Sequence, residues 1–512
     1  MAMLLLTVMQ GTSFTLTLAI RGPLASDAAA SLVTLLWLAM YLTAALGLVI
    51  YSGINWVTWM VRYRLALTLL VAGAAFSAFW SVDAGLTIER VIHLIGTTLI
   101  ALYLGFKLPL TSMLRSTATL LGLLMLASIV AGLAIPELGQ ETYEGTQVWA
   151  GVMASKNTLG FWAAISVLLS GSLIFWQIPT AQRFFYSALT LASLICLYFS
   201  VSATSLLAMG TAAMVMIYLH IAFSLRLGML SMLVLASLVA ALTGMAFYFI
   251  DTAELIGRSG DLTGRGDVWA QTWGLIMERP MTGVGYGTLW FPTDESVWIQ
   301  QSLTDFSWTV FHAHNGLLQL ASEIGLPLTA LAVVMIVQQL VELVYCQYQR
   351  QQPGVLFVLG FTVALMISNY SEARLLVHRE LYWVFFIALP ISMLQQVSVL
   401  QTGTSVAGIP AALPPDSSER LKHAREQLAK RRSLKKRLRK RRVTVINEPG
   451  DTQQKAIRKT NAVNTTGIRS VKAETKIQMV SSSRSANSSD KEIQDAQEMM
   501  KQKMARRQRK AG

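Results

Sequence analysis

Charged residues and cysteines are both scarce in this chain of 512 residues. Asp, Glu, Lys and Arg make up 14% of it, hydrophobic residues make up 53%, and the mean hydropathy is +0.49. A soluble protein of this length needs more charge to cover its surface, so the composition favours an integral membrane protein. The two cysteines, Cys196 and Cys346, are too few for a disulfide scaffold, and we interpret both as small apolar helix residues.

The positive charge of the chain is concentrated at its C-terminal end. Residues 401–512 contain 27 of the 42 Lys and Arg and 10 of the 28 Asp and Glu, so residues 1–400 are nearly neutral. After a proline-rich linker the tail predicts a very basic helix and then a polar, disordered stretch. It either contacts anionic lipids or a protein, or it is a solvated segment that fixes the topology. We expect no nucleic-acid partner.

Twelve apolar runs are long enough to cross about 30 Å of hydrocarbon, which takes roughly 20 helical residues. They are residues 3–20, 29–51, 65–82, 88–107, 118–135, 158–178, 184–201, 204–223, 227–250, 316–346, 354–371 and 380–398. The basic residues of the short connections fall on one side, which places the N-terminus and the tail in the cytoplasm. These residues are Arg62, Arg64, Lys107, Arg115, Arg183, Arg226 and Arg350. The sequence therefore predicts an all-α polytopic membrane protein with about 12 transmembrane helices.

One connection on the outer side is much longer than the others. Residues 251–315 lie between the ninth and tenth apolar runs, and a loop of about this length is normally functional or disordered. Its many tryptophans argue against disorder, so we predict a folded periplasmic cap. Within it, "DVWAQTWGLIMERP" predicts an amphipathic helix that ends at Pro280, followed by the glycine turn "GVGYG".

Several cationic residues lie on this outer side, although basic residues of short membrane loops normally lie on the cytoplasmic side. They are Arg258, Arg265 and Arg279 in the long loop, Lys156 at the start of the sixth run, and Arg374 and Arg379 next to the twelfth. Several guanidinium groups around one cavity suggest a polyanion, and phosphate matches their geometry best. The alternative is that each cation reaches the membrane interface or pairs with a nearby carboxylate.

The stretch "FHAHNG" places two histidines ahead of the tenth run. An extended chain at 312–314 would put His312 and His314 on one side, as a metal chelate requires, but the nearby carboxylates lack ligand spacing. We favour a base. With His314 and Asn315 in the first helical turn, the free N–H groups there disfavour imidazolium and keep the ring able to accept a proton. An interfacial histidine bonded to a loop carbonyl remains an alternative. The charge partners of His314 are expected to be the loop arginines, not Glu323.

Four stretches, in this order, resemble the O-antigen ligase/polymerase superfamily of bacterial membrane glycosyltransferases. They are "SKNTLG" (155–160), "TGRGDVWAQTWGLIMERPMTGVGYGTLW" (263–290), "HAHNGLLQLASEIGLPL" (312–328) and "SNYSEARLL" (368–376). "WSVD" (80–83) is similar to the exopolysaccharide-polymerase branch. The resemblance covers roughly residues 30–395 and leaves the tail unmatched. Pro327 departs from the glycine that many members have there, so we expect a different helix packing at that point.

The resemblance implies a GT-C-like fold that acts at the periplasmic face of the inner membrane without a metal or another cofactor. Its donor would be an undecaprenyl-pyrophosphate-linked glycan, and its acceptor a sugar hydroxyl on lipid A–core or on another glycan. His314 matches the family's catalytic base, and Arg265 and Arg279 match the arginines assigned to the pyrophosphate. Lys156 and Asn157 match a pair near the cavity. The predicted substrate-binding set also includes Arg258, His312, Asn315 and Arg374.

Three functions remain open at this stage. A ligase and a repeat-unit polymerase share this chemistry and differ in their acceptor. A transporter of another class would also suit twelve spans, but we find no related halves in the sequence. The absence of a Walker A motif argues against an ATP-driven pump subunit.

Overall fold

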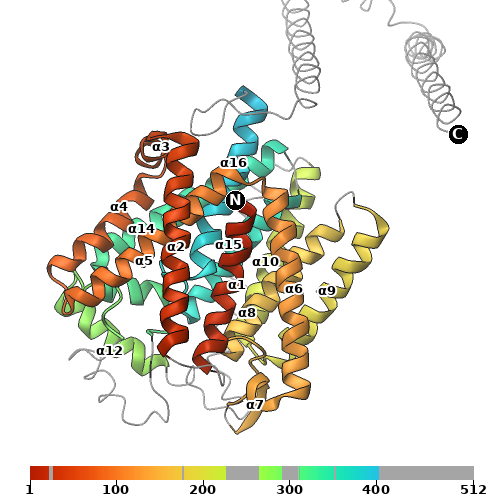
Figure 1. Cartoon of the computed structure of the whole chain (residues 1–512), viewed down its shortest axis with the longest axis horizontal. Coiled ribbons are helices and arrows are strands. Elements are labelled where there is room, and N and C mark those ends of the chain that lie inside the picture. Colours follow the sequence, from red (N-terminus) through yellow and green to blue (C-terminus); the bar gives the residue numbers. More distant parts are fainter. Residues whose placement is uncertain are drawn as a thin grey trace, which may run out of the picture. The chain divides into compact units, whose positions relative to one another are not determined.

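The computed structural model describes residues 1–21, 27–143, 145–175, 178–225, 265–290, 310, 312–350 and 353–402. The chain divides into two units, 1–412 and 413–512, and every described residue belongs to the first. This first unit is a bundle of helices with one short β-hairpin (Figure 1). The predicted helical membrane class is therefore confirmed, whereas the tail beyond residue 402 lies outside the described residues.

The helices follow the apolar runs of the sequence. In chain order they are α1 (Ala2–Arg21), α2 (Asp27–Ser52), α3 (Asn55–Tyr63), α4 (Leu65–Phe76), the 3-10 turn η1 (Ser77–Phe79), α5 (Ala84–Lys107), α6 (Leu110–Ala134), α7 (Pro136–Gly139), α8 (Lys156–Ile174), α9 (Thr180–Phe199), α10 (Ala203–Ser224), α12 (Arg265–Glu278), α14 (Gly316–Arg350), α15 (Pro353–Ser371) and α16 (Leu381–Thr402). Strands β1 (Gln140–Tyr143) and β2 (Thr146–Trp149) pair antiparallel. Helices occupy eleven of the twelve predicted runs, and the ninth run, 227–250, lies outside the described residues.

Seven of the described helices are long and apolar enough to cross a membrane. An eighth span results if the bent pair α3–α4 is counted as one, and α1 and α16 contribute shorter apolar segments. The multi-pass character of the protein is thus confirmed. The predicted number of twelve spans is not reached within the part of the chain that the structure describes.

The run predicted as a span over 65–82 follows a sharp bend in the chain. Helix α3 and the segment that begins with α4 meet at 102° around Arg64, whose φ of −132° and ψ of 41° are not helical. The buried guanidinium of Arg64 contacts the Glu342 carboxylate of α14 at 2.6 and 2.8 Å. A buried cation needs such a partner. The hydropathy of the sequence does not predict this pair, so it does not predict the bend.

Helix α14 is also interrupted, although a single span was predicted over 316–346. Gly325 has φ 81° and ψ 165°, and Pro327 has no N–H to donate to the carbonyl of Glu323. That carbonyl instead accepts from the amide of Gly285 at 2.9 Å. The glycine turn after α12 therefore replaces part of the hydrogen bonding that the break in α14 removes.

The predicted helix before Pro280 and the glycine turn after it are confirmed. Helix α12 ends two residues before Pro280, and the three glycines of "GVGYG" all have positive φ, between 64° and 111°. Figure 1 shows α12 and α7 at one end of the bundle and α3 at the other. The end with α12 is where connections predicted on the outer side of the membrane meet.

Candidate functional site

The two histidines of "FHAHNG" lie together just before α14. His314 has φ 48°, and its amide donates to Nδ1 of His312 at 3.1 Å. This turn brings the two ring centroids to 4.0 Å from each other. The rings are thus on the same side, as predicted, but the chain between them is turned and not extended.

Asn315 caps α14 and precedes its first turn. Its Oδ1 accepts from the amides of Leu317 and Leu318 at 3.0 and 3.1 Å. The prediction that His314 and Asn315 occupy the first helical turn is therefore wrong by one to two residues, because the helix begins at Gly316. Side-chain capping satisfies amides that would otherwise attract an anion.

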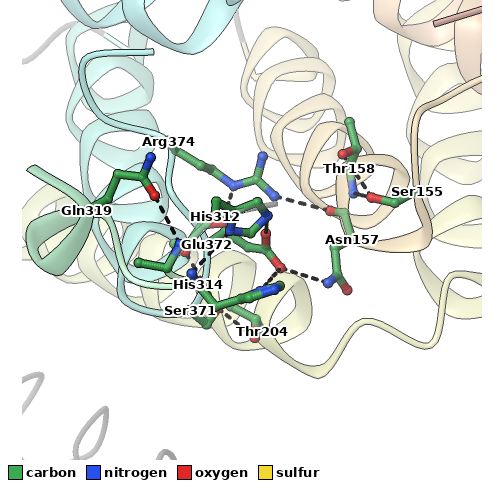
Figure 2. Close-up of polar contacts among 12 residues, drawn as sticks. Ser155, Asn157, Thr158, Thr204, His312, His314, Gln319, Ser371, Glu372 and Arg374 are labelled. Carbon is green, nitrogen blue, oxygen red and sulfur yellow. Dashed lines mark hydrogen bonds and ion pairs between the residues drawn. The ribbon is translucent and has the colours of Figure 1, made fainter. Parts of the chain in front are cut away.

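A carboxylate joins the histidines at the end of α15. Glu372 places Oε2 at 3.4 Å from Nε2 of His312 and Oε1 at 3.8 Å from Nδ1 of His314 (Figure 2). Its Oε1 also accepts from Nδ2 of Asn157 at 2.8 Å. Burial alone would raise the pKa of Glu372, but the contact with His314 and the charges of His312 and Arg374 hold it well below its ordinary value.

Arg374 lies beside this carboxylate and is buried. Its Nε donates to Oγ of Ser368 at 2.6 Å and its Nη2 to the carbonyl of Asn157 at 3.4 Å. The guanidinium also lies 4.5 Å from the ring centre of Phe161 and 4.8 Å from that of Tyr382. These contacts fix the cation in one orientation at the wall of the site.

Glycine lets the ends of two helices meet at the site. Oδ1 of Asn369 accepts from the amides of Arg374 and Leu375 at 3.0 and 2.9 Å, which fixes the chain after α15. A Cβ on Gly316 would lie 2.0 Å from that oxygen. The start of α14 can approach the end of α15 only because residue 316 has no side chain.

The histidine turn is held from its other side by a chain of hydrogen bonds. Gln319 accepts from the amide of Ala313 at 2.9 Å and donates to Glu323 at 2.6 Å, and Glu323 accepts from the amide of Gly287 at 2.9 Å. Trp269 of α12 donates to the carbonyl of Ala313 at 3.0 Å. Glu323 thus links the glycine turn to α14.

The other cations predicted for the site differ in their surroundings. Lys156 is buried, and its Nζ lies 3.3 Å from the ring centre of Tyr143 in the hairpin. Arg279 is exposed after the end of α12. Position 265 begins α12 one turn before Trp269, so both share a helix face, but the Arg265 side chain and Arg258 lie outside what is described.

The donor set of the cluster could in principle hold a metal ion. One ligand atom from each of His312, His314 and Glu372 lies within 4.8 Å of the others, and two imidazoles with one carboxylate occur in catalytic zinc sites. The hydrogen bonds favour proton chemistry instead. Because Nδ1 of His312 accepts a hydrogen bond from the amide of His314, its Nε2 carries the ring hydrogen and points it at Glu372, while Asn157 donates to the other carboxylate oxygen.

The same contacts assign the base role to one nitrogen of His314. A proton on Nδ1 of His314 faces the Glu372 carboxylate, so Nε2 is the nitrogen that carries the lone pair. The carboxylate would stabilise the imidazolium that forms when Nε2 takes a proton. The cluster is therefore suited to general-base catalysis.

Two matches with known proteins bear on the family of this chain. A sequence model of the family described as O-antigen ligase matches residues 188–333. The exopolysaccharide production protein ExoQ of Rhizobium meliloti (strain 1021) is 24% identical over 319 residues, which cover 59% of this chain and 71% of that protein. The predicted O-antigen ligase/polymerase superfamily is confirmed. The region matched to the O-antigen ligase family includes both histidines, whereas Asn157, Glu372 and Arg374 lie outside it.

The sequence motifs did not identify Glu372, the central carboxylate, as a site residue. Loop arginines were expected to be the charge partners of His314, but among the described residues Glu372 has that position. The available signal was a carboxylate at the end of an apolar run, two residues before Arg374. Gln319 holds the histidine turn, and no sequence motif apart from its position on α14 predicted this role.

Proposed function

We propose that this protein is a glycosyltransferase that moves a glycan from undecaprenyl-pyrophosphate to an acceptor sugar hydroxyl at the periplasmic face of the inner membrane. The observation that carries the proposal is the pairing of His314 with the buried carboxylate of Glu372 in a member of this superfamily. Asn157, the histidine turn and Glu372 come from three connections, all predicted on the outer side. A GT-C-like arrangement of the spans belongs to the same proposal.

In the proposed reaction, Nε2 of His314 takes the proton of the acceptor hydroxyl as its oxygen attacks the anomeric carbon of the donor. The bond from that carbon to the pyrophosphate oxygen breaks, and the pyrophosphate leaves with the electron pair. Glu372 stabilises the imidazolium that forms. General-base catalysis of this kind contributes about 10²–10⁴-fold.

Cations at the site would stabilise the negative charge on the leaving group. Arg374 and Lys156 are held by aromatic rings, and Arg265, Arg279 and Arg258 belong to the connection that ends at the histidines. Charge that develops in the transition state is stabilised most by groups already fixed in place. No metal or nucleotide is needed in this scheme, because the pyrophosphate is the activated leaving group.

The acceptor separates two forms of the proposal. The O-antigen ligase description fits transfer to lipid A–core, and the name of the ExoQ relative associates that protein with exopolysaccharide production. This relative and the "WSVD" stretch support the alternative, in which the acceptor is another lipid-linked glycan and the reaction polymerises repeat units. A mutant that accumulates long lipid-linked polymer without attaching it to core would identify a ligase.

Residues 1–400 would form the transferase body and residues 401–512 a cytoplasmic tail that contacts anionic lipid or a protein. Deletion of 401–512 should leave the transfer chemistry intact while altering membrane distribution or partner binding. A deletion variant with unchanged activity and distribution would reduce the tail to a solvated segment that fixes topology.

The test is reconstitution of the purified protein in vesicles with a defined lipid-pyrophosphate glycan and candidate acceptors. His314→Ala should lose transfer by at least about 10²-fold. His220→Ala is the matched control, because His220 is exposed on α10 and outside the site. Turnover by His314→Ala equal to that of the unaltered protein would contradict the proposal.

A further inference from the structure

The connection between α9 and α10 brings a row of hydroxyl groups to the site. It reads "SVSATS" over residues 200–205, and we call it the serine connection. Its three serines, Ser200, Ser202 and Ser205, are buried. Like the three connections that form the His314 cluster, it is predicted on the outer side of the membrane.

Ser202 uses its hydroxyl for a contact outside its own helix. It stands at the N-cap of α10 with φ −94° and ψ 96°, a position where serine normally accepts a hydrogen bond from an amide of the first turn. Within the described residues, Ser202 makes no such cap. Its Oγ instead donates to Oδ1 of Asn157 at 3.3 Å and lies 2.8 Å from Oγ of Ser205. Because a hydroxyl has one hydrogen, Ser205 is the donor to Ser202.

The hydrogen bonds run in one direction toward the carboxylate. An ionised carboxylate only accepts hydrogen bonds, so the amide of Asn157 turns Nδ2 to Glu372, which it contacts at 2.8 Å. Oδ1 of the same amide then faces the Ser202 hydroxyl. Without that donor the amide of Asn157 would rotate more readily about its last bond, and Glu372 would lose a fixed partner.

Two features of the backbone allow the serine connection to approach α8. Gly160 lies one turn after Asn157, and a Cβ on it would be 2.7 Å from Cβ of Ser202. Val201, just before Ser202, has φ 46°, which is rare for a β-branched residue. Backbone strain of this kind persists where the surrounding contacts require it, and it is often found at functional sites. The contact between Ser202 and Asn157 therefore depends on a glycine and on an uncommon turn.

The serine connection also holds the chain that carries Glu372. Oγ1 of Thr204 accepts from Oγ of Ser371 at 3.0 Å, and Ser371 directly precedes Glu372 (Figure 2). One segment thus contacts both sides of the hydrogen bond between Asn157 and Glu372.

We propose that Ser202 is a positioning residue for the transfer reaction, which sets the orientation of the Asn157 amide and through it that of the Glu372 carboxylate. Ser205 supports this role by donating to the Ser202 oxygen. The inference rests on the proposed function, because this orientation affects transfer only if His314 acts as the base. No proton leaves Ser202 in the reaction, and its effect on the rate passes through two hydrogen bonds.

The test is a double-mutant cycle on transfer by the full-length protein in vesicles, with an undecaprenyl-pyrophosphate-linked glycan as donor. Ser202→Ala should lower kcat about tenfold and leave KM unchanged, because the lost hydrogen bond disturbs the base and not the substrate. In the Asn157→Ala background the same substitution should have no further effect, because the amide that Ser202 holds is gone. Ser205→Ala keeps the Ser202 hydroxyl and should lower kcat less. If Ser202→Ala does not fold, Ser205→Ala takes its place in the cycle.

Ser193→Ala is the matched control. Ser193 is buried on α9 and donates to Oγ of Ser166 on α8 at 2.7 Å, so this variant also loses a buried serine contact with α8. It should lower the Tm and leave kcat unchanged. A loss of kcat in Ser193→Ala as large as that in Ser202→Ala would overturn the inference, because it would show a general effect of packing.

The remaining outcomes separate this inference from the proposed function. With His314→Ala inactive, an unchanged kcat in Ser202→Ala would overturn the inference alone. An equal loss in the Asn157→Ala background would do the same, since Ser202 would then act without Asn157. Full turnover by His314→Ala, or no transfer by the unaltered protein, would contradict the proposed function and this inference with it.

Discussion

Asn157 donates from Nδ2 to Oε1 of Glu372 at 2.8 Å, which joins the first turn of α8 to the end of α15 across 215 residues of sequence. The same oxygen faces Nδ1 of His314 at 3.8 Å. The amide therefore fixes the carboxylate that orients the imidazole. This arrangement has consequences for activity that can be measured residue by residue.

Replacing Glu372 by Gln should reduce glycan transfer by about 10²–10⁴-fold. The amide has nearly the same shape but no charge to stabilise the imidazolium, and it can no longer impose the tautomer that places the lone pair of His314 on Nε2. Single-turnover rates in reconstituted vesicles give the measurement. Glu278→Gln is a matched control, since Glu278 is exposed at the end of α12. A Glu372→Gln rate within threefold of the unaltered protein would remove Glu372 from the mechanism.

Asn157→Asp should impair transfer more than Asn157→Ala does. The alanine variant loses one hydrogen bond to Glu372, whereas the aspartate places a second carboxylate within hydrogen-bond distance of the first. One of the two carboxylates would then take up a proton or turn away, and His314 would lose its partner. Comparing the two transfer rates at pH 7 checks the order; the reverse order would mean that Asn157 acts on the substrate and not through Glu372.

Much of the fold was predictable from the sequence because a long apolar run that crosses a membrane must be helical. Each long apolar run must satisfy its backbone hydrogen bonds internally, so helices were expected and were found in eleven of the twelve runs. The bend at Arg64 and the break at Gly325 were not predicted. Both depend on one partner far away in sequence, Glu342 for the first and the glycine turn for the second.

The site was predictable only in part for a similar reason. His312, His314 and Asn157 stood in recognisable motifs, and the structure brings them together. Predicting Glu372 as a site residue would have required knowledge of the contact between α8 and α15, which no local sequence pattern specifies. The turn at His314 was missed as well, because φ 48° at a residue with a side chain depends on the hydrogen bond to His312 and on the clamp by Gln319.

The pH dependence of stability should separate two carboxylates of the same connection. The pKa of Glu372 is lowered in the folded protein, so its contribution to stability is complete above its ordinary pKa of about 4.3 and is lost as pH falls through the lowered value. The Tm difference between the unaltered protein and Glu372→Gln should therefore be constant from pH 8 to 5 and shrink only below about pH 4.

The contribution of Glu380 to stability should depend on pH in the opposite direction. Burial raises the pKa of Glu380 to about 7, and the charge of Arg374 offsets this only in part. A raised carboxyl pKa favours the folded state at low pH, and that contribution is lost as pH rises from about 4.3 through 7. Glu380→Gln should therefore raise the Tm at pH 8 relative to the unaltered protein and change it little at pH 4. Parallel curves for the two variants would contradict both assignments.

Removal of metal ions should leave transfer unchanged. The hydrogen bonds of His312, Glu372 and Asn157 already account for the atoms that would bind a cation. Transfer by protein treated with a chelator and then dialysed tests this directly, with and without added Zn²⁺. Loss of activity that Zn²⁺ restores, together with equal loss in His312→Ala and His314→Ala, would favour a zinc site over a base.

Substituting Gly325 by Ala should destabilise the protein and lower transfer together. The residue has φ 81°, and a Cβ there would lie 2.4 Å from the carbonyl oxygen of Met281, so both backbone strain and a clash oppose the change. The loss should appear as a lower Tm in detergent. Gly274→Ala is the matched control, because Gly274 is a helical glycine of α12 with open space around it. The break in α14 positions Glu323, which holds Gln319 and through it the histidine turn. A variant with lower stability but normal transfer would show that the His314 turn is fixed by Asn315 and Trp269 alone, without this chain of contacts.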